Sequence, residues 1–575
     1  MKKLMITYFL LTYITASAQQ FTTSFEKTNG LQTATYFECT GFYNDAKLKF
    51  NTINIKKFDT ADAGYPLELV LFDKDRQFNP VEWHKQNKVV ILINNGIHPG
   101  EPDGIDASMM FIRDLANGKI IAPSNVVIAV IPVYNIGGAL NRNSFSRVNQ
   151  NGPESYGFRG NAQNLDLNRD FIKADSKNAH VFEKIFHWLD PDIFIDNHVS
   201  DGADYQHTMS MLTTQYNKLG YETGTFLHDV FEPTLYKGMR TKQWPMCPYV
   251  NFEEGNVENG WDAFYDPPRY SSGYAALFQT IAFVPETHML KPFEDRVKST
   301  YAFMQTVMEQ ASVYAKEIID KRKASIQSVK QQKTFAISWQ VDSSRFDMID
   351  FKGYEASYKT SEVTGLQRLY YDHNKPFEKQ VKFYDTYKPA LTIQKPKAYI
   401  IPQGWHDVID LLKLNGVQLT CLTKDTTIFL SYYHIDDYKS ATKAYEKHHF
   451  NYNVMVTEKQ DSIHFLKGDY IIYTGQREDR YIVETLEPQA DDSYFHWNFF
   501  DAVLQQKEGY SDYRWEDVAA DYLKQHPQLK QLLEEKKSTD TAFAASASAQ
   551  LNFVYKNSPY YETAHLRYPV YRLTQ

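Results

Sequence analysis

The stretch Ile91–Asp103, ILINNGIHPGEPD, changes character within a few residues. The continuous apolar run Val89–Ile93 predicts a buried strand, and the Asn-Asn-Gly that follows it predicts a turn. His98 and Glu101 come directly after this turn. A neutral imidazole nitrogen and a carboxylate oxygen are ligands that zinc accepts, although a His-x-x-Glu pair on its own is more often a hydrogen-bonded loop pair. The stretch therefore predicts a strand that ends in a candidate cation site.

The segments around this stretch predict an α/β fold. Residues from about 21 to 85 alternate polar and apolar positions, as in 36–42 and 67–72, which is typical of strands joined by turns. Residues 105–115 have the apolar spacing of a helix, and 126–133 form a second continuous apolar run. Fully apolar strands connected by a helix predict a mixed, mostly parallel sheet that is flanked by helices on both faces.

The rest of the chain predicts further elements and two domains. The expected elements are a long Gly/Asn-rich loop at 134–168, a helix at 179–188, strands at 191–196 and near 275–284, and a long helix at 293–321. The stretch 325–334 is polar and rich in lysine, and short strand-like runs follow it, with helices at 406–414 and near 518–533. We expect a catalytic domain over residues 19–325 and a β-rich accessory domain over residues 335–575.

The first 18 residues have the three regions of a secretory signal. Lys2 and Lys3 form the charged start, Leu4–Ile14 the apolar middle, and Ala16-Ser17-Ala18 a small-residue cleavage site. The apolar part is short for a bilayer span, no later run reaches about 18 apolar residues, and no cysteine follows it that could carry a lipid anchor. The sequence predicts a periplasmic or secreted protein without a membrane anchor.

Composition narrows the class of partner. The chain has 575 residues, 43% of them hydrophobic, and a formal net charge of −8. This mild acidity argues against nucleic acid as a partner. The three cysteines, Cys39, Cys247 and Cys421, are widely spaced, so that at most one disulfide can form and the fold depends on its apolar core.

Three of the predicted apolar strands end in residues that can do chemistry. His98 and Glu101 follow the first of them, His198 follows the strand at 191–196, and Glu286 follows the run at 275–284. Because open parallel sheets place their sites at the carboxyl ends of the strands, we expect these side chains to converge. Two histidines and one glutamate leave a fourth position for water, as in a catalytic zinc site. Glu286 is then free to serve as the base.

The long loop adds a second motif, Asn164-Leu-Asp166-Leu-Asn168-Arg169-Asp170. Strict alternation would place Asp166, Asn168 and Asp170 on one face and Arg169 on the other, unless a turn intervenes. An arginine beside an asparagine amide can hold a carboxylate with defined geometry.

Taken together, the motifs HPGE, NLDLNRD, DNH and FVPETH resemble the zinc carboxypeptidase family of the carboxypeptidase A type, in the family's order and over roughly residues 85–320. The resemblance implies that His98, Glu101 and His198 bind one Zn²⁺ ion per chain. It also implies hydrolysis of C-terminal peptide bonds of exported or dietary peptides by a zinc-activated water.

Further roles follow from the resemblance, position by position. Asn168 and Arg169 match the pair that binds the terminal carboxylate of the substrate, and Glu286 matches the general acid/base. Asp166 resembles the carboxylate that orients His98, a partner that ligating histidines usually have.

Two matches to the family pattern are incomplete. The arginine that polarises the scissile carbonyl is either Arg142 or Arg147, and we favour Arg147 because it precedes the Asn/Gly-rich turn. The family's mobile tyrosine is assigned to Tyr265, although Tyr270 and Tyr274 lie in the same segment. Asp170 stands where many members have Asn, which would change the polarity of the recognition site.

The sequence is also compatible with two other functions. The same site could trim cell-wall peptides, which the signal peptide motivates, or the chain could be a catalytically inert binding protein. The aromatic segment 495–501 could form a ledge for glycans or peptides, but we favour an interface packed against the catalytic domain.

Overall fold

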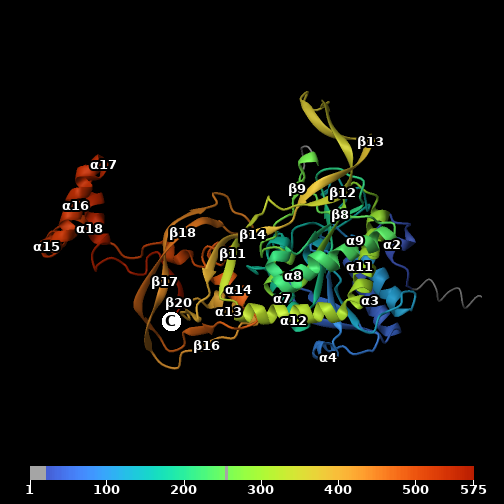
Figure 1. Cartoon of the computed structure of the whole chain (residues 1–575), viewed down its shortest axis with the longest axis horizontal. Helices are drawn as coiled ribbons and strands as arrows, with labels where there is room; N and C mark the ends of the chain where they lie inside the picture. The colour runs from blue at the N-terminus through green and yellow to red at the C-terminus, as the bar shows by residue number, and fades with distance from the viewer. Residues whose placement is uncertain (1–20, 253–256, 575) are drawn as a thin grey trace, which may run out of the picture.

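The structure is a computed structural model and describes residues 21–252 and 257–574. The signal peptide predicted at residues 1–18 lies outside the described residues. Figure 1 shows an N-terminal part (residues 21–331), a C-terminal part beside it (residues 334–574), and a small group of helices that stands apart at the far end of the C-terminal part.

The N-terminal part is built on a nine-stranded sheet with the order β1-β2-β4-β3-β5-β10-β7-β8, and β6 pairs with β10. Its strands are β1 (Ile53–Thr60), β2 (Pro66–Phe72), β3 (Val89–Asn94), β4 (Val126–Ile131), β5 (Ile193–Asp196), β6 (His198–Ser200), β7 (Met209–Thr213), β8 (Cys247–Pro248) and β10 (Ile281–His288). Strand β3 is parallel to β4 and β5, and β10 is parallel to β5 and β6, whereas β1–β2, β2–β4 and β7–β10 are antiparallel. The mixed, mostly parallel sheet is therefore confirmed.

Helices cover this sheet on both faces, since every residue of β3, β4 and β5 is buried. The helices of this part are α2 (Ser24–Lys27), α3 (Tyr36–Lys49), α4 (Pro80–Lys85), α5 (Asp103–Ala116), α6 (Ile136–Leu140), α7 (Lys177–Leu189), α8 (Tyr221–Phe226), α9 (Glu232–Thr241), α10 (Ser271–Leu277), α11 (Phe293–Val313) and α12 (Ala315–Gln331). Between α6 and α7 the chain runs in irregular structure up to the short 3-10 helix η2 (Leu167–Arg169), as the Gly/Asn-rich composition predicted.

The strand predicted at residues 36–42 is wrong, because these residues begin helix α3. Thr35 and Glu38 form a reciprocal capping box: the backbone N–H of each donates to the side chain of the other, at 2.8 Å and 3.3 Å. A helix with satisfied first-turn donors is favoured over a strand even though the residues alternate in polarity.

Two other segments differ in their boundaries. The apolar run 275–284 divides into the end of α10 and the start of β10, and the chain reverses at Gln279, whose φ is +54°. An apolar run cannot by itself distinguish a buried helix from a buried strand. The helix predicted at 293–321 is two helices, α11 and α12, separated at Tyr314.

The C-terminal part is β-rich, as predicted. A six-stranded sheet has the order β16-β19-β15-β20-β17-β18, while β11 pairs with β14, and β12 forms a long hairpin with β13 that also pairs with β9. The bounds are β9 (Trp261–Asp262), β11 (Thr334–Val341), β12 (Asp347–Thr360), β13 (Gln367–Tyr384), β14 (Tyr387–Gln394), β15 (Ala398–Ile401), β16 (Thr420–Cys421), β17 (Thr426–Ser440), β18 (Asn451–Phe465), β19 (Tyr470–Tyr473) and β20 (Arg567–Leu573).

Six helices accompany these strands: α13 (His406–Leu414), α14 (Asp479–Leu486), α15 (Asp512–Gln525), α16 (Pro527–Thr539), α17 (Thr541–Ala544) and α18 (Ala547–Lys556). Helices α15 to α18 pack around their own small core, which includes Trp515 and Tyr555, and form the outlying group in Figure 1. The helix predicted near 518–533 is thus two helices, because Pro527 begins a new one.

One hydrophobic core runs through both parts, from Phe25 to Val570. It includes the segment around Phe495, Trp497 and Phe500, whose side chains are buried, so this aromatic segment is a packed interface. The domain boundary predicted between 325 and 335 stays a prediction. Among the described residues, none of the helices has both the length and the apolar character that a bilayer crossing requires.

Candidate metal centre

The candidate site lies where β3 and β5 end, beside the start of β6 and the last residues of β10. His98 and Glu101 are on the turn between β3 and α5, which the Glu101 N–H closes by donating to the His98 carbonyl at 2.8 Å. His198 begins β6 and is in register with Glu286 on the parallel strand β10. The sheet therefore brings together residues that the sequence separates widely, as expected for the carboxyl ends of parallel strands.

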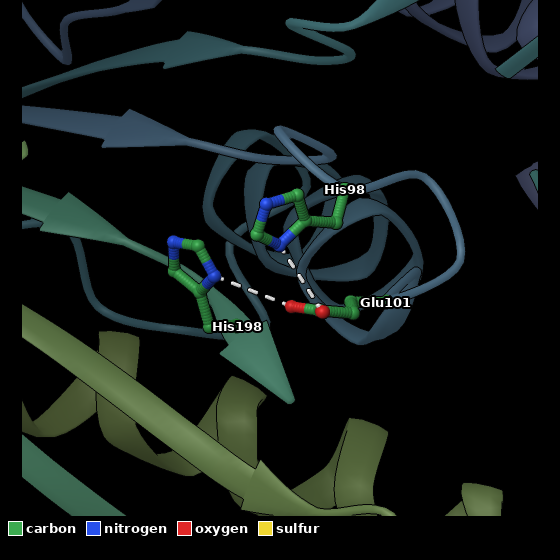
Figure 2. Close-up of side chains that lie close together, drawn as sticks. All are labelled: His98, Glu101 and His198. Carbon is green, nitrogen blue, oxygen red and sulfur yellow. Dashed lines mark hydrogen bonds and ion pairs between the residues drawn. The ribbon is translucent and has the colours of Figure 1, made fainter. Parts of the chain in front are cut away.

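His98, Glu101 and His198 point toward one common point (Figure 2). The Nδ1 atom of His98 lies 3.1 Å from one Glu101 carboxylate oxygen, and the Nδ1 atom of His198 lies 3.2 Å from the other. One ligand atom from each of the three residues lies within 4.8 Å of the others, and all three side chains are buried. Two imidazole nitrogens and a carboxylate are the donor set of a divalent metal site with an open position.

The outward nitrogen of each histidine is bound to a carboxylate. His98 Nε2 lies 2.8 Å from Asp166 Oδ1, and His198 Nε2 lies 3.1 Å from Asp196 Oδ2. Each imidazole N–H is therefore expected to donate outward, which leaves the Nδ1 lone pair facing the centre, as a metal ligand requires. The orientation of the two imidazoles therefore fits a bound metal ion. Asp196 was not predicted, although it precedes His198 by two residues in the DNH motif.

Charge around Asp166 keeps it ionised. Burial alone raises the pKa of this carboxyl, but the imidazole of His98 and the guanidinium of Arg159 together hold it well below its usual range. Arg159 lies 2.8 Å from Asp166 and 3.6 Å from Glu101. The sequence reasoning missed Arg159, which lies seven residues before Asp166 in the same loop.

A cavity of about 560 Å³ opens above the three candidate ligands. Glu286 lines it and is partly exposed to it, and no described residue accepts or donates a hydrogen bond with its carboxylate. Burial and the neighbouring Glu101 raise the pKa of Glu286, while His198 opposes the shift. Asn168 and Arg169, which were predicted to bind the substrate, also line the cavity, as do Arg147, predicted to polarise the scissile carbonyl, and Tyr270.

The structure distinguishes between Arg142 and Arg147, the two candidates for the arginine that polarises the scissile carbonyl. Arg147 lines the cavity, and its Nη1 donates to Glu101 at 2.9 Å. Arg142 is directed elsewhere, since it donates to the carbonyls of Ser155 at 2.7 Å and Ala34 at 3.4 Å. Arg147 and Arg159 are thus the arginines that face the candidate metal centre.

Asn168 and Arg169 belong to η2, whose first turn is capped by Asp166. Because the chain turns here, the alternation expected along an extended strand does not apply. Asn168 Oδ1 is buried without a hydrogen-bond partner, and the Arg169 guanidinium lies 4.5 Å from the centre of the Tyr270 ring. Both residues line the cavity.

Tyr265 and Asp170 lie outside the cavity. The Tyr265 hydroxyl donates to Asp491 of the C-terminal part at 2.7 Å, whereas Tyr270, one of the alternatives in the same segment, lines the cavity. Asp170 is fully buried and accepts from Lys173 and from the backbone N–H groups of residues 175 and 176. Its carboxylate organises the loop and does not alter the polarity of the cavity.

Comparison with known proteins gives relatives of one kind. A carboxypeptidase 2 of Trichophyton rubrum is 22% identical over 454 residues, which cover 72% of this chain and 74% of the relative. A carboxypeptidase 2 of Trichophyton equinum is 21% identical over 455 residues, with the same coverage of both chains. Over most of its length this chain is thus similar in sequence to fungal proteins named carboxypeptidase 2. No protein-family model matches it.

Two solved structures of carboxypeptidases show partial similarity to this chain. A metallo-carboxypeptidase from Burkholderia cenocepacia is 13% identical, covers 48% of this chain and 69% of its own, and has a TM-score of 0.35. A carboxypeptidase A from Helicoverpa armigera is also 13% identical, with coverages of 49% and 74% and a TM-score of 0.36.

Proposed function

We propose that this protein is a zinc metallocarboxypeptidase that hydrolyses the C-terminal peptide bond of exported peptides. The observation that carries the proposal is the convergence, in one cavity, of a buried His-Glu-His donor set, a separate carboxylate and an arginine-asparagine pair. A peptide with a free C-terminus presents chemistry that matches each of these groups. The relatives named carboxypeptidase 2 support the same class of reaction.

The metal would be held by His98 Nδ1, His198 Nδ1 and the carboxylate of Glu101. When bound there, zinc supplies Lewis acidity, which acidifies water and polarises a peptide carbonyl. Asp166 and Asp196 keep the two imidazoles oriented for this task.

Glu286 is the residue placed to move the proton. It accepts the proton of the attacking water and then donates it to the nitrogen of the leaving amine. A carboxyl whose pKa is raised by its surroundings can both accept and donate a proton near neutral pH. Arg147 and Arg159 provide positive charge beside Glu101, where the oxygen of the scissile carbonyl gains negative charge.

Arg169 and Asn168 would bind the terminal carboxylate of the substrate. A guanidinium binds a carboxylate through two parallel N–H donors, and an amide can add a third contact. This interaction fixes which peptide bond reaches Glu286, since only the last residue then fits between the carboxylate-binding pair and the candidate metal ligands.

The direct test compares one peptide in two forms, with a free C-terminal carboxylate and with a C-terminal amide. The zinc-loaded protein should release the last residue of the free acid, and the amide should be cleaved at least about 100-fold more slowly. Removal of metal by a chelator should abolish cleavage, and zinc should restore it. Equal cleavage of acid and amide, or full activity without metal, would refute the proposal.

A further inference from the structure

A tight turn of the C-terminal part lies against the predicted carboxylate-binding loop. The turn is Tyr445-Glu446-Lys447-His448, in the connection between β17 and β18. Tyr445 and His448 exchange two backbone hydrogen bonds, of 2.7 Å and 3.0 Å. The two central residues have φ of +46° and +75°, which non-glycine residues rarely adopt. Such backbone strain persists where the surroundings hold it, and it is common at functional sites.

Side chains of this turn bind the loop that carries Asp166 and Arg169. The Tyr445 hydroxyl accepts from Arg169 Nε at 2.9 Å, and Glu446 Oε2 accepts from the backbone N–H of Asp166 at 2.8 Å. His448 Nε2 lies 2.7 Å from Asp175 Oδ2. Burial raises the pKa of Asp175, but the hydrogen bonds from His448 and Lys173 bring it down to about 2, so this carboxylate is ionised at neutral pH.

The contact with Tyr445 sets the orientation of Arg169. Nε is bound to the tyrosine, Nη1 donates to the Asn168 carbonyl at 2.8 Å, and the guanidinium plane lies over Tyr270. Among the described residues, no atom accepts from Nη2. The guanidinium is therefore held on three sides and keeps donor capacity for the cavity that it lines.

The turn packs against an aromatic side chain of the C-terminal part. The Tyr445 ring stacks on Trp497, with ring centres 6.2 Å apart and planes inclined by 20°, and Trp497 is fully buried. Arg269 lies 5.0 Å from the same indole and forms a hydrogen-bonded ion pair with Asp492. Tyr445 is thus fixed by a packed aromatic base, unlike a side chain on a free surface loop.

We propose that the turn 445–448 is a positioning element of the substrate site, in which Tyr445 orients Arg169 and Glu446 fixes the backbone at Asp166. The C-terminal part then takes part in recognition of the substrate's terminal carboxylate. This inference rests on the proposed function, because it assigns Tyr445 a role through Arg169. Tyr445 is a positioning residue, since it does not line the cavity.

The test uses Tyr445→Phe in the full-length, zinc-loaded protein, which removes one hydroxyl and keeps the ring on Trp497. The KM for a peptide with a free C-terminus should rise about 10-fold, while kcat changes by less than about 2-fold. Tyr452→Phe is the matched control, because Tyr452 lies in β18 of the same hairpin and contacts neither Arg169 nor the cavity. It should behave as the wild type.

A second background separates orientation of Arg169 from a general structural effect. Lysine has no Nε–H, so in Arg169→Lys the substitution Tyr445→Phe should have no further effect on KM. A loss of the same size in both backgrounds would overturn the inference, as would an unchanged KM in Tyr445→Phe alone.

Binding measurements keep this test distinct from that of the proposed function. Calorimetry of the peptide acid and amide with the zinc-loaded Glu286→Gln protein reports carboxylate recognition without turnover. If this protein prefers the acid and Tyr445→Phe removes about 10-fold of that preference, the inference stands even when no cleavage occurs. If the preference survives Tyr445→Phe intact, the inference fails although the proposed function can hold.

Discussion

His98 Nε2 and Asp166 Oδ1 lie 2.8 Å apart, and this contact joins the turn after β3 to the loop that carries Asn168 and Arg169. One carboxylate thereby orients a candidate metal ligand and, through its cap on the Asn168 N–H at 2.9 Å, also shapes the candidate substrate-binding turn. The metal centre and the substrate-binding loop are therefore structurally coupled.

Asp166→Asn should weaken zinc binding by about 10- to 100-fold, because the amide removes the charge that orients the His98 imidazole. Competition with a chromophoric chelator measures this affinity directly. Asp45→Asn, on the exposed side of α3, is the control and should leave the affinity unchanged. An Asp166→Asn protein that binds zinc as tightly as the wild type would contradict the role assigned to this carboxylate.

Glu286→Gln should retain one zinc ion per chain and lose at least about 100-fold in kcat, since glutamine cannot accept the proton of the attacking water. Metal analysis and peptide turnover on the same sample check both halves of this expectation. Loss of zinc in this variant would indicate that Glu286 is a metal ligand. Unchanged turnover would show that Glu286 takes no part in the reaction.

Arg147→Gln and Arg159→Gln should each lower kcat by about 10- to 1,000-fold, because each guanidinium faces the centre where negative charge develops. Arg142→Gln should leave kcat per zinc-loaded molecule close to that of the wild type, since Arg142 is bound to carbonyls outside the cavity. A large loss of kcat in Arg142→Gln alone would reverse this assignment.

Gly104→Ala should destabilise the protein by about 1–3 kcal/mol through overpacking at the start of α5. A Cβ atom there would lie 2.5 Å from Asn197 Cβ, directly before His198, and would also overlap the Asn95 side chain. Gly41→Ala in α3 is the control: it has open space around it and should stabilise by about 0.5–1 kcal/mol. Chemical denaturation of the two variants should shift in opposite directions.

His228 ties the segment before α9 to the β12–β13 hairpin through a charged cluster. The hydrogen bond with Asp385 raises the pKa of His228 to about 9, against the effect of burial, with Asp229, Asp347 and Glu232 also nearby. Burial raises the pKa of Glu232 to about 7, so its charge is complete only above that pH.

Because the folded pKa of His228 is raised, its stabilising contribution is fully present below about pH 6.5 and is lost as the pH rises through about 9. His228→Gln should therefore cost about 1–2 kcal/mol of unfolding free energy at pH 6 and little at pH 10, allowing for partial exposure of the imidazole. Urea unfolding at the two pH values, with exposed His406→Gln as control, checks this. A cost that grows with pH would contradict it.

The sequence was sufficient to predict the central sheet and the convergence of His98, Glu101 and His198, because continuous apolar strands and their carboxyl ends leave local signals. It also pointed to the pairing of His98 with Asp166. Alternating polarity at residues 36–42 predicts a strand, but the capping box formed by Thr35 and Glu38 is an equally local signal and favours the helix α3 that the structure shows.

The contacts of Tyr445 and Glu446 could not be predicted in the same way. They depend on how the C-terminal sheet packs against a loop more than 270 residues earlier, and no periodicity or motif in 445–448 reports that packing. Tyr265 illustrates the same point, since its spacing before Glu286 fits a substrate-binding tyrosine while tertiary packing turns it toward Asp491.

The most direct test of the account is anomalous X-ray scattering at the zinc edge from crystals of the zinc-loaded protein. We expect one peak per chain in the cavity, bounded by the Nδ1 atoms of His98 and His198 and by a carboxylate oxygen of Glu101. An absent peak at that position, or a peak held by the Nε2 atoms or by other residues, would contradict the central claim.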